Sequence, residues 1–177
     1  PIDAYNLLKS RRETLTYYPV LVIFLLVMII RVASIYIVHF PLANIEPEDT
    51  SIWIEMAKMA VPLLTWIIAC YAITSILGGE SFISEIAMGS AFAMVPYIVF
   101  TIPVSIFSLM LCESESVLYS AIQTFLIVWT VVLFIMSVKI LNDYNLKQVI
   151  GICLLSVFTM LLIWAILILV FALSSQL

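Results

Sequence analysis

Arg31 is the residue whose type and position most suggest chemistry. It is the only Lys, Arg, Asp or Glu in the apolar run Tyr18–Phe40, and it lies about 20 Å along the predicted helix. Charged groups inside a membrane are costly and are therefore functional candidates by default. Two alternatives stay open. Arg31 contacts an anion or substrate inside a helical bundle, or it has a structural role in which its side chain extends outward to the membrane surface or pairs with Glu46, Glu48 or Glu55.

Two prolines interrupt the third apolar run of the chain. Pro96 and Pro103 each remove a helix hydrogen bond and clash with the preceding turn, which predicts a kinked helix. In a membrane the freed carbonyls need a partner, and Thr101 and Ser105 carry nearby hydroxyls. A broken helix can line a transport site or give a packed bundle its shape, and the sequence does not decide between these alternatives.

Small residues precede the first proline. Gly89 and Ala93 are four positions apart, with Ala91 between them. This spacing lets another helix approach closely. We therefore predict that Gly89 and Ala93 form a helix-packing face.

The chain lacks the usual signatures of catalysis. It has no glycine-rich phosphate loop, no HExxH motif and only one histidine. The three cysteines, Cys70, Cys112 and Cys153, are far apart and form no CxxC pair, so zinc or redox chemistry is not indicated. We predict a protein that is not an enzyme, with no catalytic, cofactor-binding or metal site.

Five apolar runs must position these residues. The chain is 65% hydrophobic and 10% charged, whereas a soluble domain is typically about half apolar and about a quarter charged. Crossing a hydrocarbon core of about 30 Å takes about 20 helical residues. The sequence thus predicts an all-α membrane protein, a single domain over residues 1–177 with one bundle of five transmembrane helices at about 18–40, 56–77, 88–111, 117–140 and 149–173.

Basic residues predict the orientation of the bundle. Lys9, Arg11 and Arg12 precede the first span, and Lys139 and Lys147 flank the turn between the last two. Cytoplasmic loops retain Lys and Arg, so we predict the N-terminus inside and the C-terminus outside. The net charge of −4 argues against nucleic acid as a partner, because binding a polyanion needs a basic face.

Two short segments are predicted to lie at the membrane surface. Residues 1–13 place Ile2, Tyr5 and Leu8 against basic side chains, which is typical of an interfacial helix. After Gly78–Gly79, a short amphipathic turn with Glu80 and Glu85 on its polar side is expected to precede the third span.

Three stretches resemble the Yip1 domain, a five-helix membrane domain, and are closest to its bacterial members. Ser90–Phe107 (SAFAMVPYIVFTIPVSIF) is similar to its proline-containing third helix, and Ile140–Gly151 (ILNDYNLKQVIG) to its polar inner turn. Leu63–Glu85, a Trp-containing helix that ends in GGESFISE, is also similar. The matching positions, which the resemblance marks as structural, are Pro96, Tyr97, Pro103, Asp143 and Tyr144.

The resemblance implies a five-span fold that acts through protein contacts in a membrane, here a bacterial cell membrane. Eukaryotic relatives are associated with Rab-type GTPases and with transport between endoplasmic reticulum and Golgi. Their DLYGP-type motif is missing from this chain, which makes a GTPase partner doubtful.

Three functions are therefore expected, in decreasing order. The first is a non-enzymatic scaffold or accessory subunit that contacts other integral membrane proteins, such as transporter subunits, or itself. The second is a small transporter or channel subunit that uses Arg31 and the broken third helix. The third is a membrane-remodelling protein that acts through its N-terminal segment on the lipid bilayer.

Overall fold

The structure is a computed structural model that describes residues 2–10, 17–38 and 51–174, with side chains as far as residue 170. This part of the chain is helical and contains no strand. Its elements are α1 (Ile2–Ser10), α2 (Tyr18–Ile37), α3 (Ile52–Ile76), α4 (Ile83–Ala93), α5 (Val95–Ser108), the 3₁₀ turn η3 (Glu113–Glu115), α6 (Ser116–Leu141) and α7 (Leu146–Ser174).

Five helical segments are long and apolar enough to cross a membrane. They are Tyr18–Ile37, Ile52–Ile76, Ile83–Ser108, Glu113–Leu141 and Leu146–Val170. The prediction of an all-helical chain with five apolar spans is thereby confirmed. The orientation across the membrane stays a prediction.

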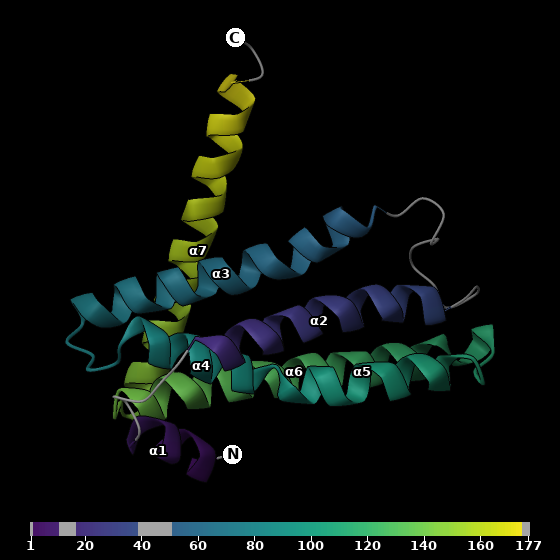
Figure 1. The fold of residues 1–177 in the computed structure, drawn as a ribbon, viewed down its shortest axis with the longest axis horizontal. Helices are drawn as coiled ribbons and strands as arrows, with labels where there is room; N and C mark the ends of the chain where they lie inside the picture. Colours follow the sequence, from purple (N-terminus) through teal and green to yellow (C-terminus); the bar gives the residue numbers. More distant parts are fainter. Residues whose placement is uncertain (1, 11–16, 39–50, 175–177) are drawn as a thin grey trace.

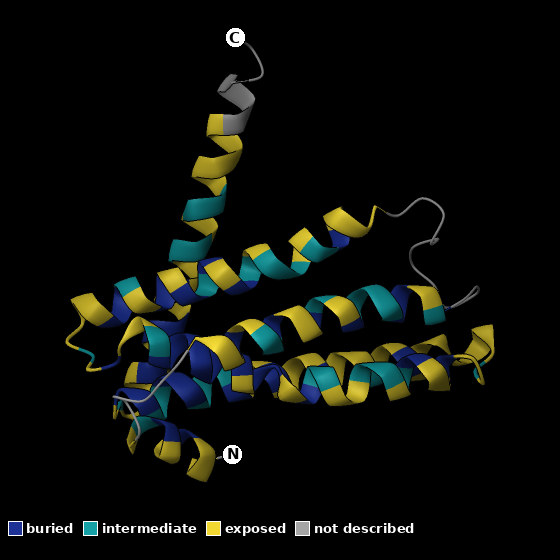
Figure 2. Cartoon of the chain, in the orientation of Figure 1, coloured by how far each residue is buried: buried dark blue, intermediate teal, exposed yellow. Residues whose placement is uncertain are grey.

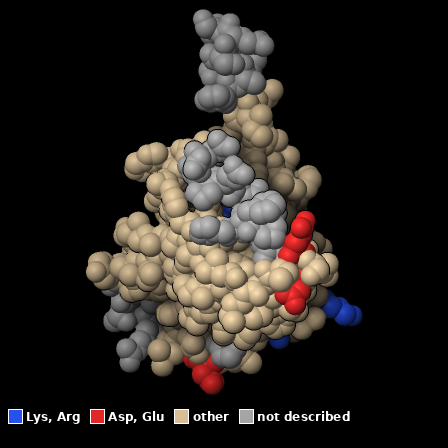
Figure 3. All heavy atoms as spheres, turned by 90° about the vertical axis from the view of Figure 1, so that its right-hand side faces the viewer, with Lys and Arg blue, Asp and Glu red and all other residues tan. Residues whose placement is uncertain are grey.

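The surface of these segments suits contact with lipid. Between 17% and 39% of the residues in an apolar stretch of 18 residues from each span are buried within the molecule. Many of the exposed positions (Figure 2) carry large apolar side chains. Figure 3 looks onto the end that carries η3, and there the charged side chains occupy only small patches. Such a surface is stable only where water is absent, because apolar area in water costs free energy.

The spans do not form a uniform parallel bundle. α2, α3, α5 and α6 run alongside one another, whereas α7 crosses them steeply and its C-terminal half projects away (Figure 1). The main hydrophobic core surrounds α4 and is built from the facing sides of α2, α3, α6 and the first turns of α7. The bundle is therefore packed most densely at the end where α4 lies.

The third span begins earlier than the sequence indicated. α4 starts at Ile83, five residues before the expected start at Met88. The Glu85 carboxylate accepts a hydrogen bond of 2.8 Å from the Phe82 N–H, which stabilises the first turn of the helix. Glu85 and Ile86 are each only 1% exposed, so Glu85 faces the core and not the polar side of a surface turn.

Close packing of α4 against α6 explains the small residues of α4. A Cβ atom on Gly89 would lie 2.7 Å from the Ser137 hydroxyl oxygen and 3.0 Å from a methyl carbon of Leu141. Ala91 and Ala93 are completely buried. The face predicted from Gly89 and Ala93 is thus used for packing inside this chain.

The third span is divided at Met94, two residues before Pro96. α4 ends at Ala93 and α5 begins at Val95, because a proline at position 96 cannot donate a bond to the carbonyl of residue 92. Pro103 lies inside α5 without dividing it. The Thr101 hydroxyl donates to the Tyr97 carbonyl at 2.6 Å, whereas the carbonyls freed by Pro96 and Pro103 are those of residues 92 and 99; that a hydroxyl satisfies them stays a prediction.

The N-terminal helix α1 docks on the protein. Tyr5 and Leu8 are 2% and 4% exposed, and the Tyr5 hydroxyl donates to the Leu133 carbonyl of α6 at 3.3 Å. Ile2 and Leu7 remain exposed. Two of the apolar side chains expected to face lipid therefore face the bundle, while residues 11–13 of the predicted segment lie outside the described part.

Candidate functional site

Arg31 occupies the later part of α2 and forms an ion pair with α3. A terminal guanidinium nitrogen lies 3.1 Å from Glu55 Oε2, and the Lys58 ammonium donates to Glu55 Oε1. Glu55 is almost completely buried, with a side chain only 2% exposed, while those of Arg31 and Lys58 are 32% and 59% exposed. Among the pairings expected from the sequence, the structure places Glu55 beside Arg31. Glu46 and Glu48 lie outside the described residues.

Chain topology brings this group together. α2 and α3 are consecutive helices that pack side by side, so the last turns of α2 meet the first turns of α3 (Figure 1). Glu55 lies in the first turn of α3, where the helix dipole favours a negative charge. One carboxylate is thus held between two cations near one end of the bundle.

A polar cavity adjoins Arg31. It has a volume of about 190 Å³ and lies between α2, α3, α5 and α6. Six of its lining residues are polar or charged: Arg31, Ser34, Tyr97, Thr101, Ser105 and Gln123. Met59, Val104, Leu126 and Ile127 complete the wall. This cavity is therefore lined by four residues already singled out in the sequence: Arg31, Tyr97, Thr101 and Ser105.

Hydrogen bonds fix several of these polar groups. The Ser34 hydroxyl donates to the Arg31 carbonyl at 2.7 Å, and Gln123 Nε2 donates to the Tyr119 hydroxyl at 2.7 Å. A guanidinium carries five N–H donors, and the bond from Arg31 Nη2 to Glu55 uses one of them. The other guanidinium donors and the second amide N–H of Gln123 lie at a cavity that is positively charged on the side of Arg31, a combination suited to anionic groups.

Two of the six polar or charged residues of the cavity were not singled out from the sequence. Ser34 and Gln123 lie within apolar runs, and that isolation is the signal that could have identified them. Single neutral polar side chains are common in transmembrane helices, where they also bond their own backbone. The signal becomes specific only when the fold shows which of them face Arg31.

Asp143 and Tyr144 belong to a different site at the other end of α6. About 20 residues of helix, or about 30 Å, separate them from Gln123. Asp143 has a positive φ of 54° and pairs with Lys9 of α1. Burial raises the pKa of Tyr144 above its ordinary value.

The turn that holds Asp143 packs against the turn after α3. Asn142 Oδ1 accepts a bond of 3.2 Å from the Ser81 N–H. A Cβ atom on Gly79 would lie 2.5 Å from both Asn142 Oδ1 and the Tyr144 hydroxyl, so a larger residue here would have to displace these side chains. The glycine pair and the NDY turn form one structural unit with α1.

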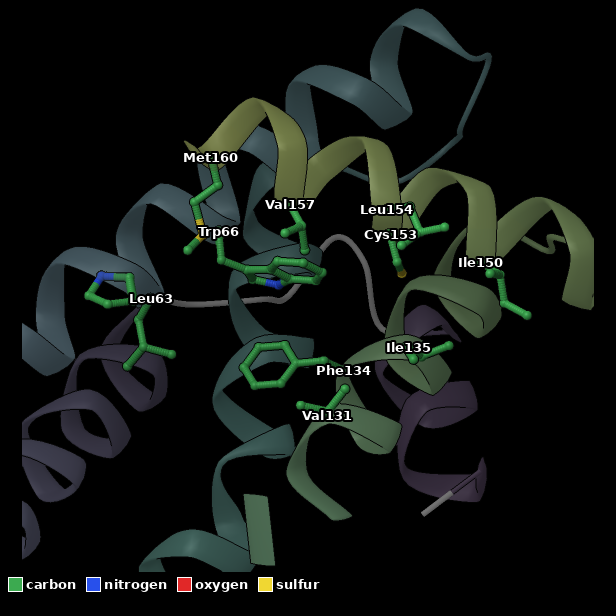
Figure 4. Close-up of a pocket in the computed structure, with 11 residues that line it drawn as sticks. Leu63, Trp66, Val131, Phe134, Ile135, Ile150, Cys153, Leu154, Val157 and Met160 are labelled. Atoms are coloured by element: carbon green, nitrogen blue, oxygen red, sulfur yellow. The ribbon is translucent and has the colours of Figure 1, made fainter. Parts of the chain in front are cut away.

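An apolar groove lies where α7 diverges from the bundle. Its volume is about 480 Å³, and Figure 4 shows its lining side chains from three helices. They are Pro62, Leu63 and Trp66 of α3, Val131, Phe134 and Ile135 of α6, and Ile150, Cys153, Leu154, Val157 and Met160 of α7. The rings of Trp66 and Phe134 pack edge to face, with 5.5 Å between their centroids. A surface of this composition can hold a hydrocarbon chain or an apolar helix face.

The described residues form no cluster of side chains that could hold a metal ion. Across residues 2–10, 17–38 and 51–174, no three His, Cys, Asp or Glu side chains are gathered for coordination. Cys70 and Cys153 are buried, while Cys112 is exposed. His39 lies outside these ranges.

Comparison with models of known protein families, with curated proteins and with solved structures found no match. The two cavities and the unit around Asp143 are therefore interpreted from their own geometry.

Proposed function

We propose that this chain is a non-enzymatic scaffold or accessory subunit that binds a transmembrane helix of another membrane protein in the groove between α3, α6 and α7. The observation that carries the proposal is the course of α7. α7 is the most apolar of the five spans and the least buried, since only 17% of the residues in its apolar stretch lie inside the molecule. α7 leaves the bundle beside the groove (Figure 1) and lines it with Leu154, Val157 and Met160 (Figure 4), while Leu161, four residues beyond Val157 on the same face of α7, is also exposed.

Helix association in membranes supports this choice of partner. Lipid is as apolar as leucine, so helices associate through close packing and interhelical hydrogen bonds. Among the described residues, Trp66 Nε1 has no hydrogen-bond partner although it is buried. A partner helix that entered the groove would add packing on three sides, and a polar side chain on it would accept from Trp66.

We also propose that the chain is a Yip1-domain protein of a bacterial cell membrane. Two of the resembling stretches, the glycine turn after α3 and the NDY turn after α6, pack against each other through Gly79, Asn142 and Tyr144. Both stretches resemble parts of the Yip1 domain, and their packing against each other in this chain favours the same fold. The family reading agrees with a role in protein contacts.

The test is site-specific photo-crosslinking in native membranes followed by purification in mild detergent. A photoreactive amino acid replaces Leu154 in the groove or, as a control, Val128 on the exposed face of α6; both positions are largely exposed. We expect one membrane protein, in stoichiometric amount, to crosslink from position 154 and not from 128. Lipid adducts alone at position 154 would contradict the proposal.

A groove-filling variant adds a second test. Val157→Phe should prevent co-purification of that partner while leaving the melting temperature within a few degrees of the parent. Retention of the partner by this variant would show that the groove is not its binding site.

A subunit of a transporter or channel is the second candidate, favoured by the polar cavity beside Arg31. Solute flux through reconstituted protein should then fall in Arg31→Ala. Flux equal to that of empty vesicles for the parent chain would exclude independent transport by this protein.

A further inference from the structure

In the part of the chain that the structure describes, the charges beside the cavity do not balance. Arg31 and Lys58 both pair with the single carboxylate of Glu55, so the three side chains together carry a net charge of +1. Among the described residues, no other acidic side chain pairs with either cation. Excess charge within a membrane protein is costly unless a counter-charge is near, and the cavity is the adjoining space that can hold one.

The neutral groups around the cavity favour the same kind of ligand. Gln123 has a second amide N–H beyond the one that bonds Tyr119, and Tyr97 and Ser105 bring hydroxyls to the wall. Donors on α5 and α6 thus face the guanidinium of α2 across one space. Bonds from charged donors to oxyanions are about twice as strong as neutral ones.

The size of the cavity limits what fits. Its 190 Å³ compares with about 30 Å³ for one water in the liquid and about 300–1,000 Å³ for drug-sized pockets. A phosphate or carboxylate group is of suitable size, whereas a large solute is not.

We propose that the cavity between α2, α5 and α6 binds an oxyanion, a phosphate or carboxylate group, through Arg31 with Gln123 and the hydroxyl of Tyr97. The oxyanion belongs either to a lipid headgroup or to a small solute. This inference goes beyond the scaffold function, because the docking groove shares none of these residues.

Thermal unfolding in a neutral detergent tests the proposal. The full chain carries Cys112→Ser, so that a thiol-reactive dye reports exposure of the buried Cys70 and Cys153. Probes are inorganic phosphate against chloride at matched ionic strength, and anionic phosphatidylglycerol against zwitterionic phosphatidylcholine. A saturating ligand should raise the melting temperature by roughly 5 °C or more.

Four variants make the result specific. Arg31→Gln should abolish the rise and Arg31→Lys should retain part of it. Lys58→Gln is the matched control, because it removes one positive charge from the same cluster at a residue outside the cavity wall; it should lower the rise less than Arg31→Gln does, since Arg31 still lines the cavity. Should Arg31→Gln fail to fold, Gln123→Leu removes only a neutral donor and should weaken binding about tenfold.

Each outcome has a definite meaning. A rise with phosphate alone identifies a solute anion, and a rise with phosphatidylglycerol alone identifies a lipid headgroup. No rise with either, or a rise that survives Arg31→Gln, overturns the proposal. Equal loss in Lys58→Gln also overturns it, since the effect would then belong to the charge of the cluster and not to the cavity. Val157→Phe should lose the partner helix of the groove but keep the increase in melting temperature with the anion.

Discussion

Gly89 and Gly151 both lie inside helices, but their surroundings differ. A Cβ atom on Gly89 would meet Ser137 at 2.7 Å, whereas nothing lies within 4 Å of one on Gly151. Replacing helical glycine by alanine favours the helix by about 1 kcal/mol, and overpacking a tight contact costs about 1–3 kcal/mol. The two substitutions should therefore change stability in opposite directions.

We expect Gly89→Ala to lower the free energy of unfolding by up to about 2 kcal/mol and Gly151→Ala to raise it slightly. Melting followed by dye labelling of the buried cysteines measures both, with Gly151→Ala as the matched control. An increase in stability for Gly89→Ala would contradict the tight contact between α4 and α6. A bulkier change at Gly89 tests folding in the same way, because the face is occupied within the chain.

The residues of the polar cavity were predictable only in part. Arg31 was identifiable because a charge in an apolar run is rare. Its partner was one of three acidic candidates, since the sequence does not say which carboxylate faces α2. Gln123 was not identifiable, because a neutral side chain in an apolar run carries little energetic penalty and reveals its role only through its neighbours.

At the scale of the elements, two polar contacts of different chemistry hold α1 to the bundle. Lys9 pairs with Asp143, and the Tyr5 hydroxyl donates to the Leu133 carbonyl. Burial raises the pKa of Tyr5 from 10.0 to about 12. The docked state therefore holds the phenol proton more tightly than the released state, so docking is fully stable below pH 10 and weakens as the pH rises from 10 to about 12.

We predict release of α1 in that pH window. A fluorophore on Asp3→Cys, in a Cys112→Ser and Lys9→Arg background that keeps the ion pair charged throughout, should show falling anisotropy between pH 10 and 12. Tyr5→Phe keeps the ring packing but has no proton to lose, so it should abolish this transition. The same transition in Tyr5→Phe would show that another group controls docking.

Helix positions followed well from hydropathy, with one informative exception. The five spans were predictable because each needs about 20 apolar residues. The start of α4 was not, because Glu80 and Glu85 together resemble a solvated turn. Glu85 is instead buried and bonds the backbone at Phe82, and a local charge pattern cannot distinguish a capping carboxylate from a solvated one.

At the scale of the whole molecule, the steep course of α7 was not predictable. Its hydropathy indicates a span, but tilt depends on packing against neighbouring helices. α7 packs most closely through its first turns, where Val149, Ile152 and Cys153 are buried, and farther along Trp164 Nε1 donates to Thr65 Oγ1 of α3 at 3.2 Å. From residue 165 to residue 170 every side chain is apolar and exposed, which is why the partner proposal rests on this helix.

The distribution of Lys and Arg predicts that the end of α6 beside Lys139 faces the cytoplasm and its other end faces outward. α6 has 26 residues, a length of about 39 Å, which separates the exposed Cys112 beyond its start from Asn145 beyond its end. With the N-terminus inside, a membrane-impermeant maleimide should label Cys112 in intact cells. Cys112→Ser should remain unlabelled, because the other two cysteines are buried.

Asn145→Cys in the Cys112→Ser background provides the reciprocal measurement. This position is exposed and lies beside the basic turn, so its labelling should require permeabilised cells or inverted vesicles. Labelling of both positions from the same side would contradict five spans, because α6 would then not cross the membrane. Labelling of position 145 alone in intact cells would keep the spans but reverse the orientation, and it would move the Arg31 cavity to the half of the bilayer nearer the cytoplasm.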